Sequence, residues 1–385
     1  MSKEKLNVSS DGSLLEEEKF NGVEFLKACG QSIVSFIKSP TFRYIVKRIV
    51  SSIFTLFLVA TVVFLLLRLV PKENYINLDK TNKMDELGKQ IYVETMLEKY
   101  GLNKPVLVQL LNFWRDIIPF IPHTYCIKDG YNFNTNTYYC TEEQVKVFYL
   151  GKALFNEAGK PVTEIIATKM PISFWMSIIS TLLTYMFGYP LGIFMAKNKG
   201  KLVDKLGNGY IILSLAIPSL VFYCALWLLF QKMGIGAFYS DYDKNYIVLA
   251  APIFAMVVLS VPGTAMWARR FMVDEGDADY VKFARSKGLS ENRIMFTHVF
   301  RNAVVPLVRN FPAAFVGAII GSYYAEQVWS IPGTGRLLIN ALNIQKPDNV
   351  LVQGLVILYA AISMVSFLLG DIVTIFTDPR IKLTK

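Results

Sequence analysis

Side chains that could do chemistry gather in one polar stretch, Met272–Pro306, which lies between two long apolar runs. The stretch contains acids, lysines, arginines and His298, but no nucleophile stands beside a base and no spacing fits a set of metal ligands. Its layout therefore favours a docking element over an active site. A solvated loop that carries a charged helix is the plainer alternative.

Two short helices are predicted within Met272–Pro306. Asp277 or Asp279 can accept the free amide hydrogens at the start of the first helix. Gly288 fits the left-handed conformation that commonly ends a helix. Ser290 can cap the second helix. A Gly turn between two helices would give the segment a defined shape.

Composition places these helices in a membrane protein. The chain has 385 residues, of which 53% are hydrophobic and 18% are charged, whereas soluble domains carry about 25% charged residues. The net charge is +10, but lysines and arginines cluster beside apolar runs, as membrane topology requires, and no nucleic-acid-binding motif is present. We therefore expect membrane lipid, and no nucleic acid, among the partners.

Six apolar runs are long enough to cross a bilayer, which needs about 20 residues. The predicted fold is all-α and polytopic, and Pro218 is expected to kink the third span. The runs are Ile49–Val70, Pro171–Ala196, Tyr210–Phe230, Tyr246–Trp267, Phe311–Val328 and Val350–Phe376.

The basic residues set the orientation, because lysine and arginine favour the cytoplasmic side. Both termini and the Met272–Pro306 stretch are predicted to be cytoplasmic in a multi-pass protein of the plasma membrane, and residues 72–170 form an extracytoplasmic loop domain between helices 1 and 2. The predicted order is a segment with an amphipathic helix (1–41), the first span (42–71), the outer domain (72–170), a core with the segment 272–306 (171–380) and a tail (381–385).

Cys126 and Cys140 lie in one Asn/Tyr/Thr-rich loop of the outer domain, whose composition suits a hairpin or an irregular loop. An outer location is oxidising, so we expect a disulfide between them. Two unpaired thiols in a flexible loop are the alternative. No closely spaced cysteine pairs form a zinc pattern, and we expect no metal site.

The sequence Tyr280-Val-Lys-Phe-Ala-Arg-Ser-Lys-Gly-Leu289, followed by His298, Arg301-Asn-Ala and Pro306, resembles the cytoplasmic signature of binding-protein-dependent ABC importer permeases. It is most similar to the oligopeptide/dipeptide branch, of OppB/DppB type. Four further stretches resemble the same branch: Phe42–Pro71, Tyr100–Trp114, Glu326–Leu337, and Asp371 with Asp378-Pro-Arg380. The general signature begins Glu-Ala-Ala, whereas Lys282-Phe283-Ala284 stands here.

This resemblance implies a type I ABC importer permease fold, in which a short cytoplasmic helix inserts into an ATPase subunit. The residues expected to couple the chain to the ATPase are Tyr280, Lys282, Phe283, Ala284, Arg285, Lys287, Gly288 and Leu289. The chain has no phosphate-binding loop of the Gly-x-x-x-x-Gly-Lys-Ser/Thr type. It is therefore expected not to be an enzyme and to hold no cofactor, with ATP and Mg²⁺ bound by the partner subunits.

The implied partners are a second homologous permease subunit of OppC/DppC type, two ATPase subunits of OppD/OppF type and an extracytoplasmic peptide-binding protein. The expected cargo is oligopeptides or dipeptides; nickel chelates or glutathione are alternatives. A secondary transporter would need acids near the membrane midplane and usually internal repeats, and neither is visible. A membrane scaffold is a third possibility, suggested by the large outer loop.

Residues of the translocation path are expected among the aromatic and acidic side chains of the spans: Phe222, Tyr223, Tyr323, Tyr324 and Glu326. Acids within spans are costly and often functional. Glu326 is expected either to face the outer cavity or, the preferred alternative, to pair with Arg336. Asp371 is expected to pair with another helix. His298 is interpreted as a packing or hydrogen-bonding residue and not as a catalytic one.

Overall fold

The computed structural model describes residues 40–76, 85–118, 122–132, 137–234 and 246–377. The expected amphipathic helix within residues 1–41 and the tail 381–385 lie outside these ranges. The chain divides into two compact units, Met1–Ser51 with Ile381–Lys385, and Ser52–Arg380. Helix α2 (Pro40–Leu67) crosses the boundary between them. Contacts described below lie within the second unit.

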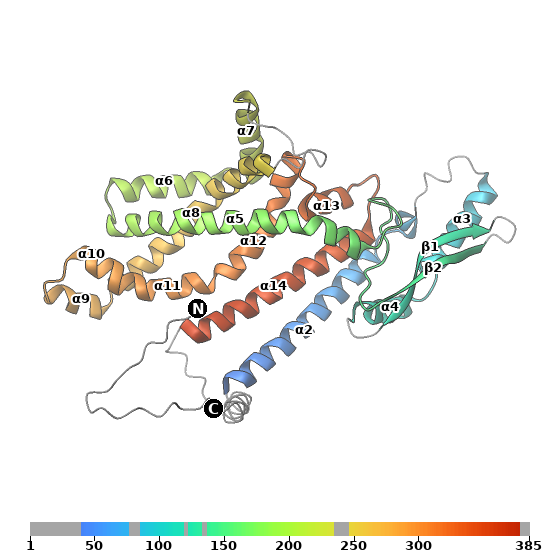
Figure 1. Cartoon of the computed structure of the whole chain (residues 1–385), viewed down its shortest axis with the longest axis horizontal. Coiled ribbons are helices and arrows are strands. Elements are labelled where there is room, and N and C mark those ends of the chain that lie inside the picture. Colours follow the sequence, from blue (N-terminus) through green and yellow to red (C-terminus); the bar gives the residue numbers. More distant parts are fainter. Residues whose placement is uncertain (1–39, 77–84, 119–121, 133–136, 235–245, 378–385) are drawn as a thin grey trace, which may run out of the picture. The chain divides into compact units, whose positions relative to one another are not determined.

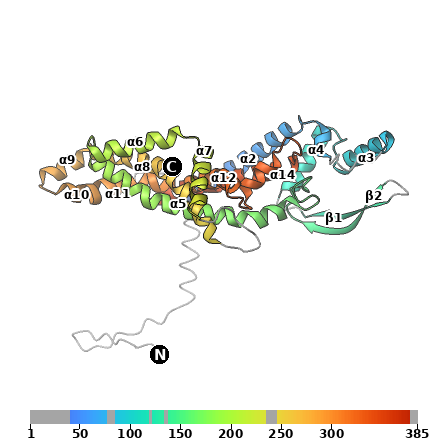
Figure 2. The same ribbon diagram turned by 90° about the horizontal axis from the view of Figure 1, so that it is seen from above.

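The segment that follows α2 contains short helices and a pair of strands. These elements are η1 (Lys72–Tyr75), α3 (Glu86–Lys99), α4 (Val106–Ile117), β1 (His123–Asn132) and β2 (Thr137–Lys146). Asp85 caps α3, because its side chain accepts the amide hydrogen of Gly88 (3.0 Å). The strands pair antiparallel from His123–Lys146 to Asn132–Thr137, with irregular register around Lys128 (Figure 2). The sequence had left a hairpin and an irregular loop open, and the strand pairing favours the hairpin.

The long helices agree with the predicted apolar runs in place, and all but one differ from them in extent. They are α5 (Val162–Lys197), α8 (Ala250–Gly276), α12 (Phe311–Val328) and α14 (Asn349–Thr377). Helix α12 has the predicted bounds, whereas α5 begins nine residues before the predicted run and contains Pro171 and Pro190 without ending.

The predicted third span is two helices, α6 (Leu202–Ala216) and α7 (Ser219–Lys232), which meet at an angle of 102°. Pro218 is the N-cap residue of α7, so the expected kink at this proline is a sharp break. Among the described residues, four helices are long and apolar enough to cross a membrane. Counting each of two bent pairs as one span brings the number to six, so the count of six stays a prediction.

Helix α8 packs closely against α5 (Figure 1). A Cβ atom at Gly192 of α5 would stand within 3 Å of the Ala265 carbonyl oxygen and of the Ala268 Cβ on α8. The absence of a side chain at Gly192 therefore sets the distance between the two helices, as small residues do at helix contacts in membranes.

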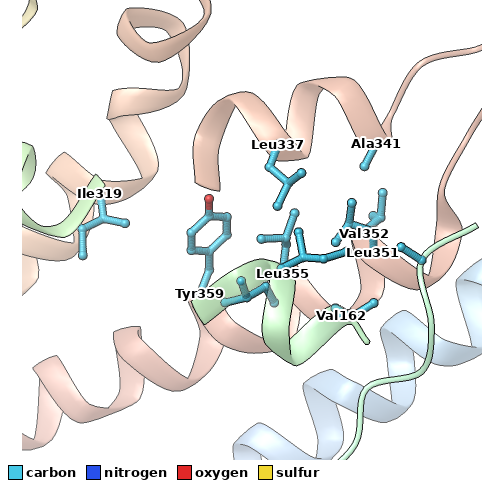
Figure 3. Packing of buried hydrophobic residues seen from close by; sticks show 11 residues of the cluster. Val162, Ile319, Leu337, Ala341, Leu351, Val352, Leu355 and Tyr359 are labelled. Carbon is cyan, nitrogen blue, oxygen red and sulfur yellow. The ribbon is translucent and has the colours of Figure 1, made fainter. Parts of the chain in front are cut away.

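A buried apolar cluster joins α5, α12, α14 and the short helix α13 (Thr334–Ala341). Figure 3 shows side chains of α13 and α14 facing one another in it, with Val162 of α5 beside them. The labelled members are Val162, Ile319, Leu337, Ala341, Leu351, Val352, Leu355 and Tyr359.

Asp348 joins this cluster to the segment that precedes α5. Its carboxylate is fully buried, and Oδ2 accepts the amide hydrogens of Leu154 (2.9 Å), Phe155 (3.0 Å) and Asn156 (3.1 Å). Oδ1 accepts the amide hydrogen of Leu351 (3.2 Å) in the first turn of α14. One side chain therefore satisfies main-chain groups of two segments almost 200 residues apart.

Candidate functional site

The stretch Met272–Pro306 forms the end of α8 and a succession of short helices: α9 (Asp279–Ser286), α10 (Glu291–Arg293), the π-helix η4 (Ile294–Val299) and α11 (Phe300–Arg309). Two helical segments separated by a turn were predicted. The N-cap of α9 is Ala278, and no side chain caps it. The prediction that Asp277 or Asp279 caps this helix is therefore wrong, because Asp279 is already its first residue and instead pairs with Lys282 (2.9 Å).

The turn after α9 depends on Gly288, which adopts the left-handed conformation (φ 73°) as predicted. The Gly288 amide donates to the Arg285 carbonyl oxygen (2.9 Å), and the Leu289 amide donates to that of Ala284 (3.4 Å). Ser290 occupies the next N-cap position, but its side chain makes no capping hydrogen bond.

One side of α9 is buried. Val281 is fully buried and Ala284 is nearly so; both pack in a cluster with Ile294 and Val299 of the π-helix and Met272 of α8. The same cluster includes Ile193 and Ala196, at the end of α5. Helix α9 and the π-helix η4 are thus packed against the ends of α5 and α8, which gives α9 a fixed orientation.

The other side of α9 is exposed and, with Lys287 just after the helix, carries four of the eight predicted coupling residues. The Phe283 ring is 61% exposed, and the Lys287 ammonium lies 4.4 Å from its centroid. Arg285 forms an exposed ion pair with Glu291 (2.8 Å). The hydrogen bond from Lys282 holds the pKa of the Asp279 carboxyl below its usual range. An exposed aromatic ring among charged pairs suits a docking surface.

The remaining residues of the predicted set have structural contacts. The Tyr280 hydroxyl donates to the Glu275 carboxylate (2.8 Å), which links α9 to the last turn of α8. Leu289 is half-buried and packs on the cluster that holds Val281. His298 is half-buried within the π-helix, a location in keeping with a packing role.

The expected path residues on α7 pack near the end of α12, and the two tyrosines expected on α12 contact each other. Phe222 and Tyr223 pack in one buried cluster with Trp329, and the Tyr223 and Trp329 ring centroids lie 6.3 Å apart. The rings of Tyr323 and Tyr324 contact each other on α12.

Glu326 lies inside the protein and is fully buried. Its carboxylate accepts hydrogen bonds from the Ser173 hydroxyl (2.7 Å), the Ser322 hydroxyl (2.7 Å) and the Arg336 main-chain amide (2.9 Å). The expected partner was the Arg336 guanidinium, and this is wrong, because that group donates to the Ser330 carbonyl oxygen (2.6 Å). We call Glu326 with Ser173, Ser322 and the Arg336 amide the Glu326 cluster.

Asp371 pairs across helices, as expected: an oxygen of its carboxylate lies 3.9 Å from the Arg309 guanidinium on α11. The structure also joins Cys126 and Cys140 in a disulfide, with Cα atoms 5.6 Å apart, in agreement with the pairing expected from their outer location.

Sequence reasoning missed a row of buried hydroxyls along α5 that begins at Ser173 in the Glu326 cluster. Three of them border a cavity of about 160 Å³ between α5, α7, α8 and α12, which is also lined by Gly317 and Gly321 of α12. Their spacing of three or four residues inside an apolar run was the available signal. The row is Ser173, Ser177, Ser180, Thr181 and Thr184.

Comparison with known proteins identifies the class to which these features belong. Residues 188–383 match the sequence profile of the binding-protein-dependent transport system inner membrane component family, and residues 41–177 match the N-terminal profile of such membrane components. The chain belongs to this family, and it is a multi-pass membrane protein and a transport component.

Several proteins that are similar in sequence to this chain are named as peptide permeases. The chain is 40% identical over 217 residues to the oligopeptide transport system permease protein AmiC of Streptococcus pneumoniae, a match that covers 54% of this chain and 42% of AmiC. It is thus aligned with less than half of AmiC. It is 27% identical over 341 residues to the dipeptide transport system permease protein DppB of Lactococcus lactis, covering 89% of this chain and 99% of DppB.

Among solved structures, the chain aligns with the MetNI methionine ABC transporter in an inward-facing conformation. The alignment covers 56% of this chain and 97% of that chain, with 13% sequence identity and a TM-score of 0.47.

Proposed function

We propose that this chain is a permease subunit of an ATP-driven importer of oligopeptides or dipeptides. The family supports an importer subunit, and the peptide cargo is supported by the names of relatives such as AmiC and DppB. In this proposal a binding protein delivers the peptide from outside. A second permease subunit completes the path, and two ATPase subunits bind ATP and Mg²⁺.

The observation that carries the coupling mechanism is the division of α9 into two faces. Val281 and Ala284 hold the helix against the ends of α5 and α8, whereas Phe283 is exposed. A helix that is fixed on one side and exposed on the other can transmit a push from a bound partner to the long helices behind it. Exposed aromatic side chains are frequent anchors of protein interfaces. Both termini and α9 face the cytoplasm in this proposal.

Replacing Phe283 with Ala tests the mechanism in the complete transporter, reconstituted with its binding protein. We expect ATP-dependent peptide uptake to fall at least tenfold, the change that a loss of about 1.4 kcal/mol of docking energy produces. The affinity of the ATPase subunits for the permease pair should fall by a similar factor. Uptake of a radiolabelled peptide and retention of the ATPases during purification are the measurements.

Phe367→Ala is the matched control, because Phe367 is similarly exposed (58%) but lies on the long helix α14. It should leave ATPase retention unchanged. Equal retention of the ATPases by the Phe283→Ala and wild-type complexes would contradict docking through α9. Uptake that persists without internal ATP, and collapses with an uncoupler, would contradict the importer itself.

A further inference from the structure

Helix α4, which belongs to the polar segment after the first span, is packed against the side of α2. The Phe113 ring stacks on the Phe64 ring with centroids 5.0 Å apart, and the Trp114 ring lies 4.8 Å from that of Phe57. The Trp114 indole also donates to the Thr61 hydroxyl (2.9 Å). These contacts fix α4 beside a helix that is apolar and long enough to span a bilayer.

The face of α4 that adjoins Trp114 is apolar and exposed. Leu107 and Leu111, four residues apart and hence on one face, are 67% and 52% exposed. Val106 and Val108 are exposed beside them. Helix α2 likewise exposes apolar side chains over most of its length, among them Phe54, Leu58, Val62 and Leu66. The packed pair α2–α4 therefore presents apolar side chains from both helices.

The contact points lie well inside the apolar run of α2. Arg68 follows α2 directly, and its guanidinium lies over the Phe64 ring (4.7 Å) and the Tyr75 ring (5.1 Å), which marks the polar end of the span. Thr61 precedes Arg68 by seven residues, or about 10 Å along a helix that rises 1.5 Å per residue. The bilayer hydrocarbon is about 30 Å thick. Trp114 is thus placed at acyl-chain depth.

We propose that α4 is an interfacial helix embedded in the leaflet at the Arg68 end of α2, with Leu107 and Leu111 in contact with lipid acyl chains. Its 12 residues are too few to span, but amphipathic helices of this kind lie about 5–10 Å into the headgroup boundary. At the entry to α4, Pro105 has no amide hydrogen, and the Gln109 side-chain amide donates to the Lys104 carbonyl oxygen (2.7 Å).

Spin labels on single cysteines measure this directly in the complete transporter in lipid nanodiscs. The background is Cys29→Ser with Cys224→Ser, which leaves the Cys126–Cys140 disulfide in place. Labels at Leu111→Cys are compared with Leu66→Cys, on the lipid-exposed face of α2, and with Glu98→Cys, on an exposed position of α3. Leu107→Cys serves as a second α4 variant if Leu111→Cys does not assemble.

The readout is collision with oxygen, which is enriched in lipid, and with a water-soluble nickel chelate. We expect the oxygen-to-nickel collision ratio at Leu111 to resemble that at Leu66 and to exceed that at Glu98 severalfold. A ratio equal to that at Glu98 would overturn the proposal and place the face in water. Protection from both reagents would also overturn it, because the face would then be covered by another subunit or by the binding protein.

Discussion

The α9 region and the Glu326 cluster use charged residues in opposite ways. On α9 the charges of Lys282 and Arg285 are exposed and paired with exposed acids, and the helix is held by apolar contacts behind them. In the Glu326 cluster the carboxyl group itself is buried, and it accepts three hydrogen bonds from α5, α12 and the start of α13.

The degree of burial therefore distinguishes a docking role from a structural role, which the sequence alone does not. A surface ion pair contributes little to stability, typically about 0–1 kcal/mol, and is available to a partner. A buried acceptor with three donors cannot be removed cheaply, because each donor left unsatisfied costs about 1–3 kcal/mol. We conclude that the Glu326 cluster maintains the contact between α5, α12 and α13.

The largest effect is expected for Glu326→Ala. The Ser173 hydroxyl and the Arg336 amide would lose their acceptor, whereas the Ser322 hydroxyl keeps the Ile319 carbonyl oxygen (2.8 Å). The thermal midpoint of the purified transporter should therefore fall sharply, and the yield of folded protein with it. Glu326→Gln retains one carbonyl oxygen and should recover part of the loss. Fluorescence-detected melting in detergent is the measurement. An unchanged midpoint for the Ala variant would show that the cluster does not hold the helices.

The two glycines at these sites should respond differently to Ala. Gly333 lies against the cluster, and a Cβ there would collide with the Glu326 carboxylate and the Ser173 hydroxyl. Gly288 has open space around it but a φ of 73°, so Ala costs only backbone strain, roughly 1–2 kcal/mol. Melting should therefore separate a large loss for Gly333→Ala from a smaller one for Gly288→Ala.

Asn tests the distinction further, because it tolerates the left-handed conformation better than other residues with side chains. Gly288→Asn should restore most of the stability lost in Gly288→Ala, whereas Gly333→Asn should be at least as damaging as Gly333→Ala. Equal responses at both positions would contradict the contrast between strain at one glycine and steric exclusion at the other.

The smallest effect on stability is expected for the exposed pair of Arg285 and Glu291. Arg285→Gln should change the free energy of unfolding by about 0.5 kcal/mol or less, and less still in high salt. Glu291→Gln should behave alike, and a double-mutant cycle gives the coupling between the two side chains. A coupling above about 2 kcal/mol would mean that the pair is not simply a surface contact.

Much of the fold could be predicted from the lengths of the apolar runs and from the residues that end helices. Phe311–Val328 was predicted with the bounds it has, because apolar composition and flanking polar residues define it. The extension of α5 to Val162 was missed, because Pro171 reads as a helix boundary, yet the helix continues through it while packing on α8 and α12.

Features that depend on tertiary contacts were the hardest to predict from the sequence. No local signal tells whether Glu326 binds the Arg336 guanidinium or its main-chain amide, because Ser173 comes from a helix more than 150 residues away. The π-helix Ile294–Val299 was likewise unpredicted; its extra residue per turn lets Ile294, Met295 and Val299 enter one apolar cluster. By contrast, Gly288 was placed correctly, because helix ends are encoded locally.

Asp348 attaches the end of the loop domain to helix α14 through hydrogen bonds. Its carboxylate ties residues 154–156 to the first turn of α14, so the chain leaving the hairpin is anchored to the last long helix before it enters α5. A displacement of residues 154–156 would therefore pull directly on the first turn of α14, although that helix lies almost 200 residues further along the chain.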